Sequence, residues 1–139
     1  MPAITGVSHV DLSVSDLDES EEWYSQLLGA SRVLDGRNEP LSFDYRYLMV
    51  PVPERGLLLG LIRHDQQTGR FDPTRPGLDH LAFEVADREA LEQWVGRLDE
   101  LGVKHDGIVE QATGDALPLR SPDGVQLELY VSAADLPWA

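Results

Sequence analysis

The chain has 139 residues, no cysteine and a formal net charge of −14, so we expect one domain without disulfides, thiolate metal sites or cysteine nucleophiles. The strong negative charge argues against a nucleic-acid or anionic-membrane partner. The longest apolar run, GLLLGLI, is far too short to span a bilayer and no Lys or Arg precedes Arg32 to start a signal peptide, so we expect a soluble, cytoplasmic protein.

The first predicted elements are a strand and a helix. The segment GVSHVDLSV, residues 6–14, alternates apolar and polar residues and includes His9, which is the period of a half-buried β-strand. Asp16 or Ser15 can cap a following helix, and the acidic residues after them suit its positive N-terminal end. Gly29 is placed to end this helix in a left-handed residue.

Three shorter strands are predicted next, around Ser31–Leu34, Phe43–Val52 and Leu57–Arg63. The polar, turn-rich stretch DQQTGRFDPTRP, residues 65–76, then predicts a linker.

The middle of the chain is rich in arginine. Residues 32–75 carry seven of the eleven Lys and Arg residues. Scattered, solvated side chains are the ordinary interpretation. The alternative is that one or two of these arginines face a cleft and hold an anionic substrate group.

The second half repeats the first. GLDHLAFEV, residues 77–85, matches residues 6–14 at an offset of 71, and a second helix and three more strands follow, around residues 104–110, 116–120 and 125–131. The matched pairs are Gly6 and Gly77, His9 and His80, Val14 and Val85, Asp16 and Asp87, Trp23 and Trp94, and Leu27 and Leu98. We therefore predict an α+β fold of two tandem βαβββ modules, about residues 4–64 and 77–131, in one domain over residues 1–139, with helices on one face of the sheets.

Three chemically capable side chains share the opposite sheet face. By strand alternation, His9, His80 and Glu128 point away from the predicted helices. The closing strands GLLLGLI and GVQLELY align so that Gly60 matches Glu128, leaving the fourth symmetric position without a side chain. Two imidazoles and one carboxylate suit a divalent first-row metal with open coordination positions. The alternatives are structural or exposed histidines, and a partly solvated carboxylate or an arginine partner at Glu128.

The chain resembles the vicinal oxygen chelate superfamily in three segments that occur in the same order. These are GVSHVDLSVSDLDESEEWYSQLLGA, GLDHLAFEVAD and SPDGVQLELYV. That superfamily includes glyoxalase I, extradiol dioxygenases, fosfomycin resistance proteins, methylmalonyl-CoA epimerase and bleomycin resistance proteins. The resemblance covers about residues 4–131. It implies curved mixed sheets that form an open cup, with helices on the outer face and a metal at the base held by His9, His80 and Glu128. Gly60 falls where glyoxalase I has a metal-binding glutamate that takes part in proton transfer, which argues against an ordinary glyoxalase I.

The reaction and the metal stay open at this level. The ion would be Fe²⁺, Mn²⁺, Ni²⁺ or Zn²⁺. For dioxygenase chemistry, His64 and Tyr130 have the parity of the cup face and are candidate acid/base groups, with rim residues as the alternative. Thiol addition of the fosfomycin type ranks lower, because no obvious basic segment follows the last strand to hold a phosphonate.

Two functions compete. The first is a metal-dependent dioxygenase, lyase or isomerase that chelates vicinal oxygens of a small substrate. The second is a metal-free protein of the bleomycin-resistance type that sequesters an aromatic or cationic antibiotic, for which Phe43, Tyr45 and Tyr47 supply aromatic rings, while Trp23 and Trp94 look like core residues. A third possibility is that the triad is an inherited remnant. The resemblance also implies a homodimer, whose metal ligands come from one chain or from two.

Overall fold

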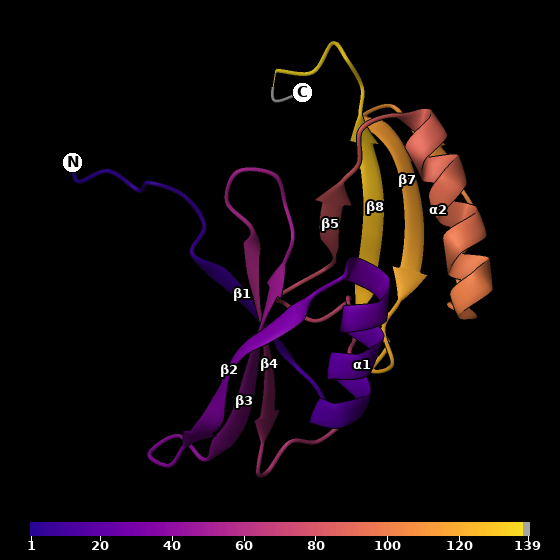
Figure 1. Ribbon diagram of the computed structural model, residues 1–139. Coiled ribbons are helices and arrows are strands. Elements are labelled where there is room, and N and C mark those ends of the chain that lie inside the picture. Colours follow the sequence, from indigo (N-terminus) through magenta and orange to yellow (C-terminus); the bar gives the residue numbers. More distant parts are fainter. Residues whose placement is uncertain (138–139) are drawn as a thin grey trace. The chain divides into compact units, whose positions relative to one another are not determined.

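Each half of the chain folds into one helix and a four-stranded mixed sheet in the computed structural model, which describes residues 1–137 (Figure 1). Two compact units result, Met1–Gly69 and a second that begins at Arg70. The first unit contains β1 (His9–Ser13), α1 (Leu17–Leu28), β2 (Ser31–Asn38), β3 (Phe43–Val50) and β4 (Leu57–His64). The second contains β5 (Leu81–Glu84), α2 (Arg88–Leu101), β6 (Val109–Gln111), β7 (Gly114–Arg120) and β8 (Gln126–Ser132). The predicted α+β class and the repeated strand–helix–three-strand order are confirmed.

The two sheets have the same topology. Their strand orders are β1-β4-β3-β2 and β5-β8-β7-β6, with the first and last strands of each unit parallel and the other pairs antiparallel. The registers also agree, since Asp11 lies opposite Gly60 in one sheet and Ala82 lies opposite Glu128 in the other. Gly60 and Glu128 therefore occupy equivalent places, as their alignment predicted.

The first helix begins and ends as predicted, and the second does so at the equivalent residues. The Asp16 carboxylate accepts a hydrogen bond from the backbone N–H of Glu19 at 3.0 Å, and Asp87 does the same for Ala90 at 2.9 Å. These contacts satisfy backbone donors that the first helical turn leaves unpaired. Gly29 and Gly102 end the helices at φ values of 65° and 67°, in the left-handed region that glycine enters without strain.

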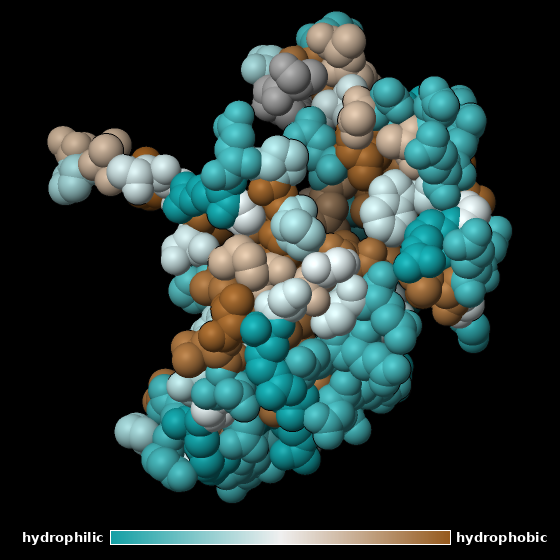
Figure 2. Space-filling view, viewed as in Figure 1, coloured by the Kyte–Doolittle hydropathy of each residue, from teal (hydrophilic) through white to brown (hydrophobic). Residues whose placement is uncertain are grey.

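The core of each unit lies between its helix and its sheet. Helix α1 contacts β3 and β4, and α2 contacts β7 and β8. The apolar strand face under the helices is buried, as at Leu59 and Leu127. The outward sides of both helices are largely hydrophilic (Figure 2). Each helix therefore presents one apolar stripe to its own sheet and a charged face to water.

Three details differ from the predictions. Trp23 and Trp94 are only half-buried, while Tyr24, edge-on to Trp23, is fully buried, so assigning both tryptophans to the core is only partly correct. The strand predicted to start at Lys104 is confined to β6, because Gly107 has a φ of 72° that interrupts an extended chain. In contrast, β2 continues to Asn38.

Among residues 1–137, no helix is both long enough and apolar enough to cross a membrane.

Candidate metal-binding site

His80 and Glu128 lie together in the second unit. Glu128 is on β8, and His80 immediately precedes β5, the strand that pairs with β8 in parallel. The Nε2 atom of His80 is 3.5 Å from Oε2 of Glu128. The carboxylate side chain is only 17% exposed and the imidazole 43%. The predicted proximity of these two groups is therefore present within one unit.

The orientation of His80 is set by the residue before it. Its Nδ1 is 2.7 Å from Oδ1 of Asp79, and because an ionised carboxylate only accepts, Nδ1 must donate. In the neutral ring, Nε2 then presents a lone pair toward the Glu128 carboxylate. Nε2 and the carboxylate oxygen, 3.5 Å apart, can both bind a cation placed between them. A carboxylate that holds the second ring nitrogen is also the usual support of a metal-binding histidine.

A cavity of about 480 Å³ adjoins this pair. Its walls include Tyr130 and Thr113, and the Tyr130 hydroxyl donates to Oγ1 of Thr113 at 2.7 Å. Gln126 also lines it and donates through Nε2 to the Asp79 carbonyl at 3.2 Å. The structure therefore brings Tyr130, one of the two predicted acid/base candidates, into the same cavity as His80 and Glu128.

His9 has a different set of neighbours in the first unit. Its Nδ1 is 3.0 Å from Oγ of Ser8, and its Nε2 is 3.9 Å from Oδ2 of Asp11. The Tyr47 hydroxyl donates to the same Asp11 oxygen at 3.0 Å. Burial, followed by this hydrogen bond, raises the pKa of Tyr47, so the phenol stays protonated and keeps donating.

The space above Gly60 is filled. A Cβ atom built on Gly60 would overlap the Asp11 carboxyl group, lying 2.7 Å from its Cγ and only 2.8 Å from Cε1 of Tyr47. Glycine is the residue that lets both side chains lie over this part of β4. Sequence analysis assigned Asp11 no role, although strand alternation puts it on the same face as His9. The signal was its position two residues after His9.

Aromatic rings follow β3 across the same sheet face. Tyr47 contacts Tyr45 at a ring-centroid distance of 5.7 Å, and Tyr45 contacts Phe43 at 6.3 Å. The series ends on His9 beside Tyr47, at 6.0 Å, and on His64 beside Phe43, at 5.4 Å. We call these five rings the aromatic row. It provides a polarisable surface suited to a planar ligand.

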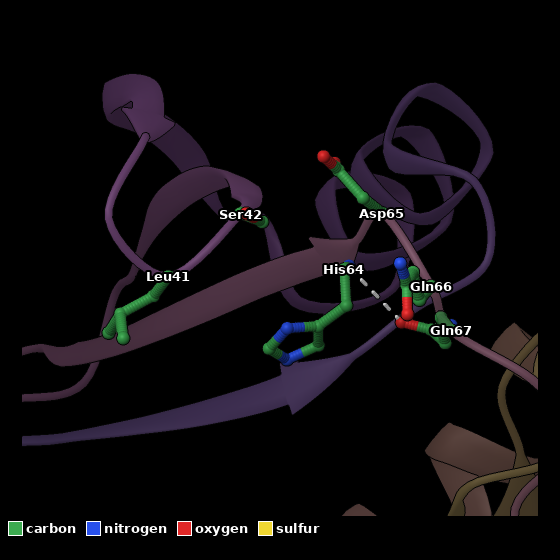
Figure 3. Close-up of a pocket in the computed structure, with 6 residues that line it drawn as sticks. All are labelled: Leu41, Ser42, His64, Asp65, Gln66 and Gln67. Atoms are coloured by element: carbon green, nitrogen blue, oxygen red, sulfur yellow. Dashed lines mark hydrogen bonds between the residues drawn. The ribbon is translucent and has the colours of Figure 1, made fainter.

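His64 lies at the far end of that row. In the β1–β4 register His9 is opposite Leu58, so His64 is displaced by six residues, or roughly 20 Å at about 3.3 Å per residue. It lines a separate cavity of about 620 Å³ with Leu41, Ser42, Asp65, Gln66 and Gln67 (Figure 3). The Gln67 carboxamide accepts from the His64 backbone N–H at 3.4 Å. The structure therefore does not bring His64 close to His9.

Three of the five arginines of the first unit are paired with carboxylates, namely Arg32, Arg37 and Arg46. Arg32 and Arg46 both donate to Glu21 on α1, with closest distances of 2.5 and 2.7 Å. Arg37 reaches Asp65 at 2.6 Å and lowers the pKa of that carboxyl group. These pairs favour the structural interpretation of the arginines over a role in binding an anionic substrate.

The predicted ligands are divided between the two units, His9 in the first and His80 with Glu128 in the second. Among residues 1–137, no group of three or more His, Asp or Glu side chains forms a ready metal site. The convergence of all three ligands therefore stays a prediction. The 3.5 Å between His80 and Glu128 nevertheless fits a divalent ion, since adjacent ligands about 2.1 Å from one ion lie roughly 3–3.5 Å apart.

Comparison with known proteins gives a family match over most of the chain. The model of the Glyoxalase/Bleomycin resistance protein/Dioxygenase superfamily matches residues 6–129. A solved glyoxylase/bleomycin resistance protein/dioxygenase domain from Frankia sp. EAN1pec is 34% identical, with 94% of this chain and 100% of that chain covered and a TM-score of 0.83.

Fosfomycin resistance proteins share the fold at lower identity. FosX from Listeria monocytogenes is 19% identical, with 96% of this chain and 98% of that chain covered and a TM-score of 0.72. Another structure of that protein is complexed with Mn(II) and a sulfate ion; it is 19% identical, with 99% and 100% covered and a TM-score of 0.68.

Proposed function

Because the chain belongs to the glyoxalase/bleomycin resistance protein/dioxygenase superfamily, we propose that it is a divalent-metal-dependent enzyme. In this proposal His9, His80 and Glu128 are metal ligands, and the substrate is a small molecule with two vicinal oxygens. The reaction is that of a dioxygenase, lyase or isomerase. The observation that carries the proposal is Nε2 of His80 lying 3.5 Å from the shielded Glu128 carboxylate.

A divalent ion bound there would supply Lewis-acid chemistry, withdrawing electron density from chelated substrate oxygens. The protein groups around His80 have supporting roles. Asp79 holds the imidazole in one tautomer, and Tyr130 with Thr113 offers hydroxyl groups to a substrate in the adjoining cavity. Tyr130 is therefore the preferred acid/base candidate. His64, about 20 Å along the sheet from the position of His9, is better suited to substrate contact.

The metal and the assembly are part of the same proposal. Fe²⁺, Mn²⁺, Ni²⁺ and Zn²⁺ all accept imidazole and carboxylate ligands. The Mn(II) in a FosX structure makes Mn²⁺ the first ion to test. His9 joins the other two ligands either within one chain or from a second copy in a homodimer.

Metal analysis tests this function. We expect one divalent ion per chain in wild-type protein reconstituted with Mn²⁺, and a loss of at least about tenfold in affinity for His80→Ala and for Glu128→Gln. His105→Ala is the matched control, because His105 lies in the same unit but pairs with Asp99 at 2.7 Å. Wild-type protein that takes up none of the four ions, or a His80→Ala variant that binds as well as wild type, would contradict the proposal.

A second candidate function is sequestration of an aromatic or cationic ligand without chemistry, and the aromatic row favours it. Phe43, Tyr45 and Tyr47 give stacking surface in a protein whose net charge is −14. The discriminating measurement is fluorescence titration of metal-stripped protein with bleomycin, an intact cationic antibiotic. Micromolar binding that does not change when metal is restored supports sequestration, and binding that requires metal supports the enzyme.

A further inference from the structure

The two units carry a carboxylate on different strands of the equivalent strand pair. In the second unit Glu128 on β8 lies opposite Ala82 on β5. In the first unit the equivalent pair is Gly60 on β4 opposite Asp11 on β1. Each pair contains one acidic residue and one residue small enough to leave room for it. The pseudo-symmetry is therefore preserved at the level of the strand pair, although it fails at the single position 60.

The histidines are oriented alike toward these carboxylates. In each unit Nδ1 contacts the side chain of the preceding residue, Ser8 at 3.0 Å or Asp79 at 2.7 Å. In each unit Nε2 is then directed to the acidic group, at 3.9 Å for Asp11 and 3.5 Å for Glu128. The two histidines therefore have the same arrangement of contacts, with Nδ1 next to the preceding residue and Nε2 directed to a carboxylate.

Asp11 is held in place and remains accessible. The Tyr47 hydroxyl donates to Oδ2 at 3.0 Å, which fixes the carboxylate above Gly60. The Asp11 side chain is still 34% exposed, and its neighbour His9 45%. A carboxylate that is oriented by a phenol and exposed on one side is available to bind a metal ion.

We propose that Asp11 is a fourth metal ligand, which supplies from β1 the carboxylate that Gly60 lacks on β4. This inference rests on the proposed function, and it changes the ligand set from two histidines and one carboxylate to two histidines and two carboxylates. Gly60 then leaves the space that the Asp11 side chain occupies, and its lack of a side chain is not the loss of a ligand. The glycine alone no longer argues against chemistry that uses four protein ligands.

Equilibrium dialysis with Mn²⁺, followed by metal analysis, tests the assignment without any substrate. Asp11→Asn keeps the shape of the side chain and an oxygen that can accept from Tyr47, but it removes the charge. We expect it to weaken Mn²⁺ binding at least about tenfold. Ser13→Ala, on the same strand face two residues further on, is the matched control and should bind as wild type does.

A second variant keeps the test independent of Asp11→Asn. Asp11→Ala removes the carboxylate altogether and should also weaken Mn²⁺ binding at least about tenfold. Circular dichroism checks folding, and Asp11→Ala decides the question if Asp11→Asn does not fold. Asp11→Asn that binds Mn²⁺ like wild type, while His80→Ala does not bind, overturns the inference and leaves the proposed function standing. Wild-type protein that binds no Mn²⁺, Fe²⁺, Ni²⁺ or Zn²⁺ overturns both.

Discussion

At the scale of single residues, Tyr47 contributes both to the packing of the aromatic row and to the candidate site. Its ring lies in the aromatic row between Tyr45 and His9, and its hydroxyl donates to Asp11 at 3.0 Å. Burial and the neighbouring carboxylate both raise the pKa of Tyr47 above the ordinary value of 10.0. The phenol therefore acts as a hydrogen-bond donor throughout the neutral range.

Removal of that hydroxyl should have a measurable but modest effect. We expect Tyr47→Phe to lower the free energy of unfolding by about 1 kcal/mol, because the Asp11 carboxylate loses the hydrogen bond that the half-buried phenol donates. Urea unfolding at pH 7 measures the change. Tyr45→Phe removes the adjacent hydroxyl without affecting Asp11 and is the control. Equal stability of Tyr47→Phe and wild type would show that the bond contributes nothing.

At the scale of elements, an ion-pair cluster joins α1 to the sheet of the first unit. Glu21 on α1 accepts from Arg32 on β2 and from Arg46 on β3. The hydrogen bond from Arg32 is the main cause that lowers the pKa of Glu21 from 4.5, against the opposing effect of burial. The cluster therefore stabilises the contact of helix and strands only while Glu21 is ionised.

This cluster predicts a pH-dependent stability difference. The Glu21 carboxylate stabilises the fold fully above its unfolded pKa of about 4.5, and that contribution is lost as the pH falls through the lower folded pKa. We expect Glu21→Gln to cost about 1 kcal/mol at pH 7. The difference from wild type should shrink between pH 5 and pH 3 in urea unfolding experiments. A difference that is constant over this range would contradict the assignment.

At the scale of the whole molecule, the chain uses one structural plan twice and differentiates the copies by a few side chains. Both units have the same strand order, capped helix and parallel pairing of first and last strands. The first unit differs in its aromatic row and in the Asp11–Gly60 pair, and the second in the cavity beside His80 and Glu128. The two halves of the repeated fold therefore differ in the side chains on their sheets rather than in their architecture.

Metal binding should stabilise the folded protein as a whole. An ion that binds only the native state adds about 2.7 kcal/mol at a free concentration of one hundred times Kd. We therefore expect Mn²⁺ to raise the thermal unfolding midpoint by several degrees and a chelator to reverse the rise. His80→Ala should abolish the shift, while His105→Ala should retain it. A shift of equal size in both variants would indicate non-specific binding.

Much of the fold follows from local patterns. Strand alternation, the caps Asp16 and Asp87, and the terminating Gly29 and Gly102 all depend on nearby residues, so they could be predicted from the sequence. Tyr24 rather than Trp23 reaches the core because the angular position of a helix depends on packing. The start of β6 was mispredicted because one left-handed glycine, Gly107, outweighs the apolar residues around it.

For the candidate site, the sequence could predict only the sheet face on which each side chain lies. Side-chain parity placed Glu128, Tyr130 and His80 on one face, and the structure brings these three around one cavity. Parity gives the sheet face of a side chain but not its distance along the strand, which is why His64 was assigned to the same site as His9 although it lies six residues further along the sheet. The role of Asp11 depends on the β1–β4 register and on the space over Gly60, and neither is local information.

The occupied space above Gly60 also imposes an order on any change of sequence. An acidic side chain introduced at residue 60 meets the one already at residue 11, so residue 11 must first become small. If the two residues change one at a time and this overlap is avoided, the intermediate sequence has no acidic residue at position 11 or at position 60. An acidic residue at position 60 therefore requires a small residue at position 11.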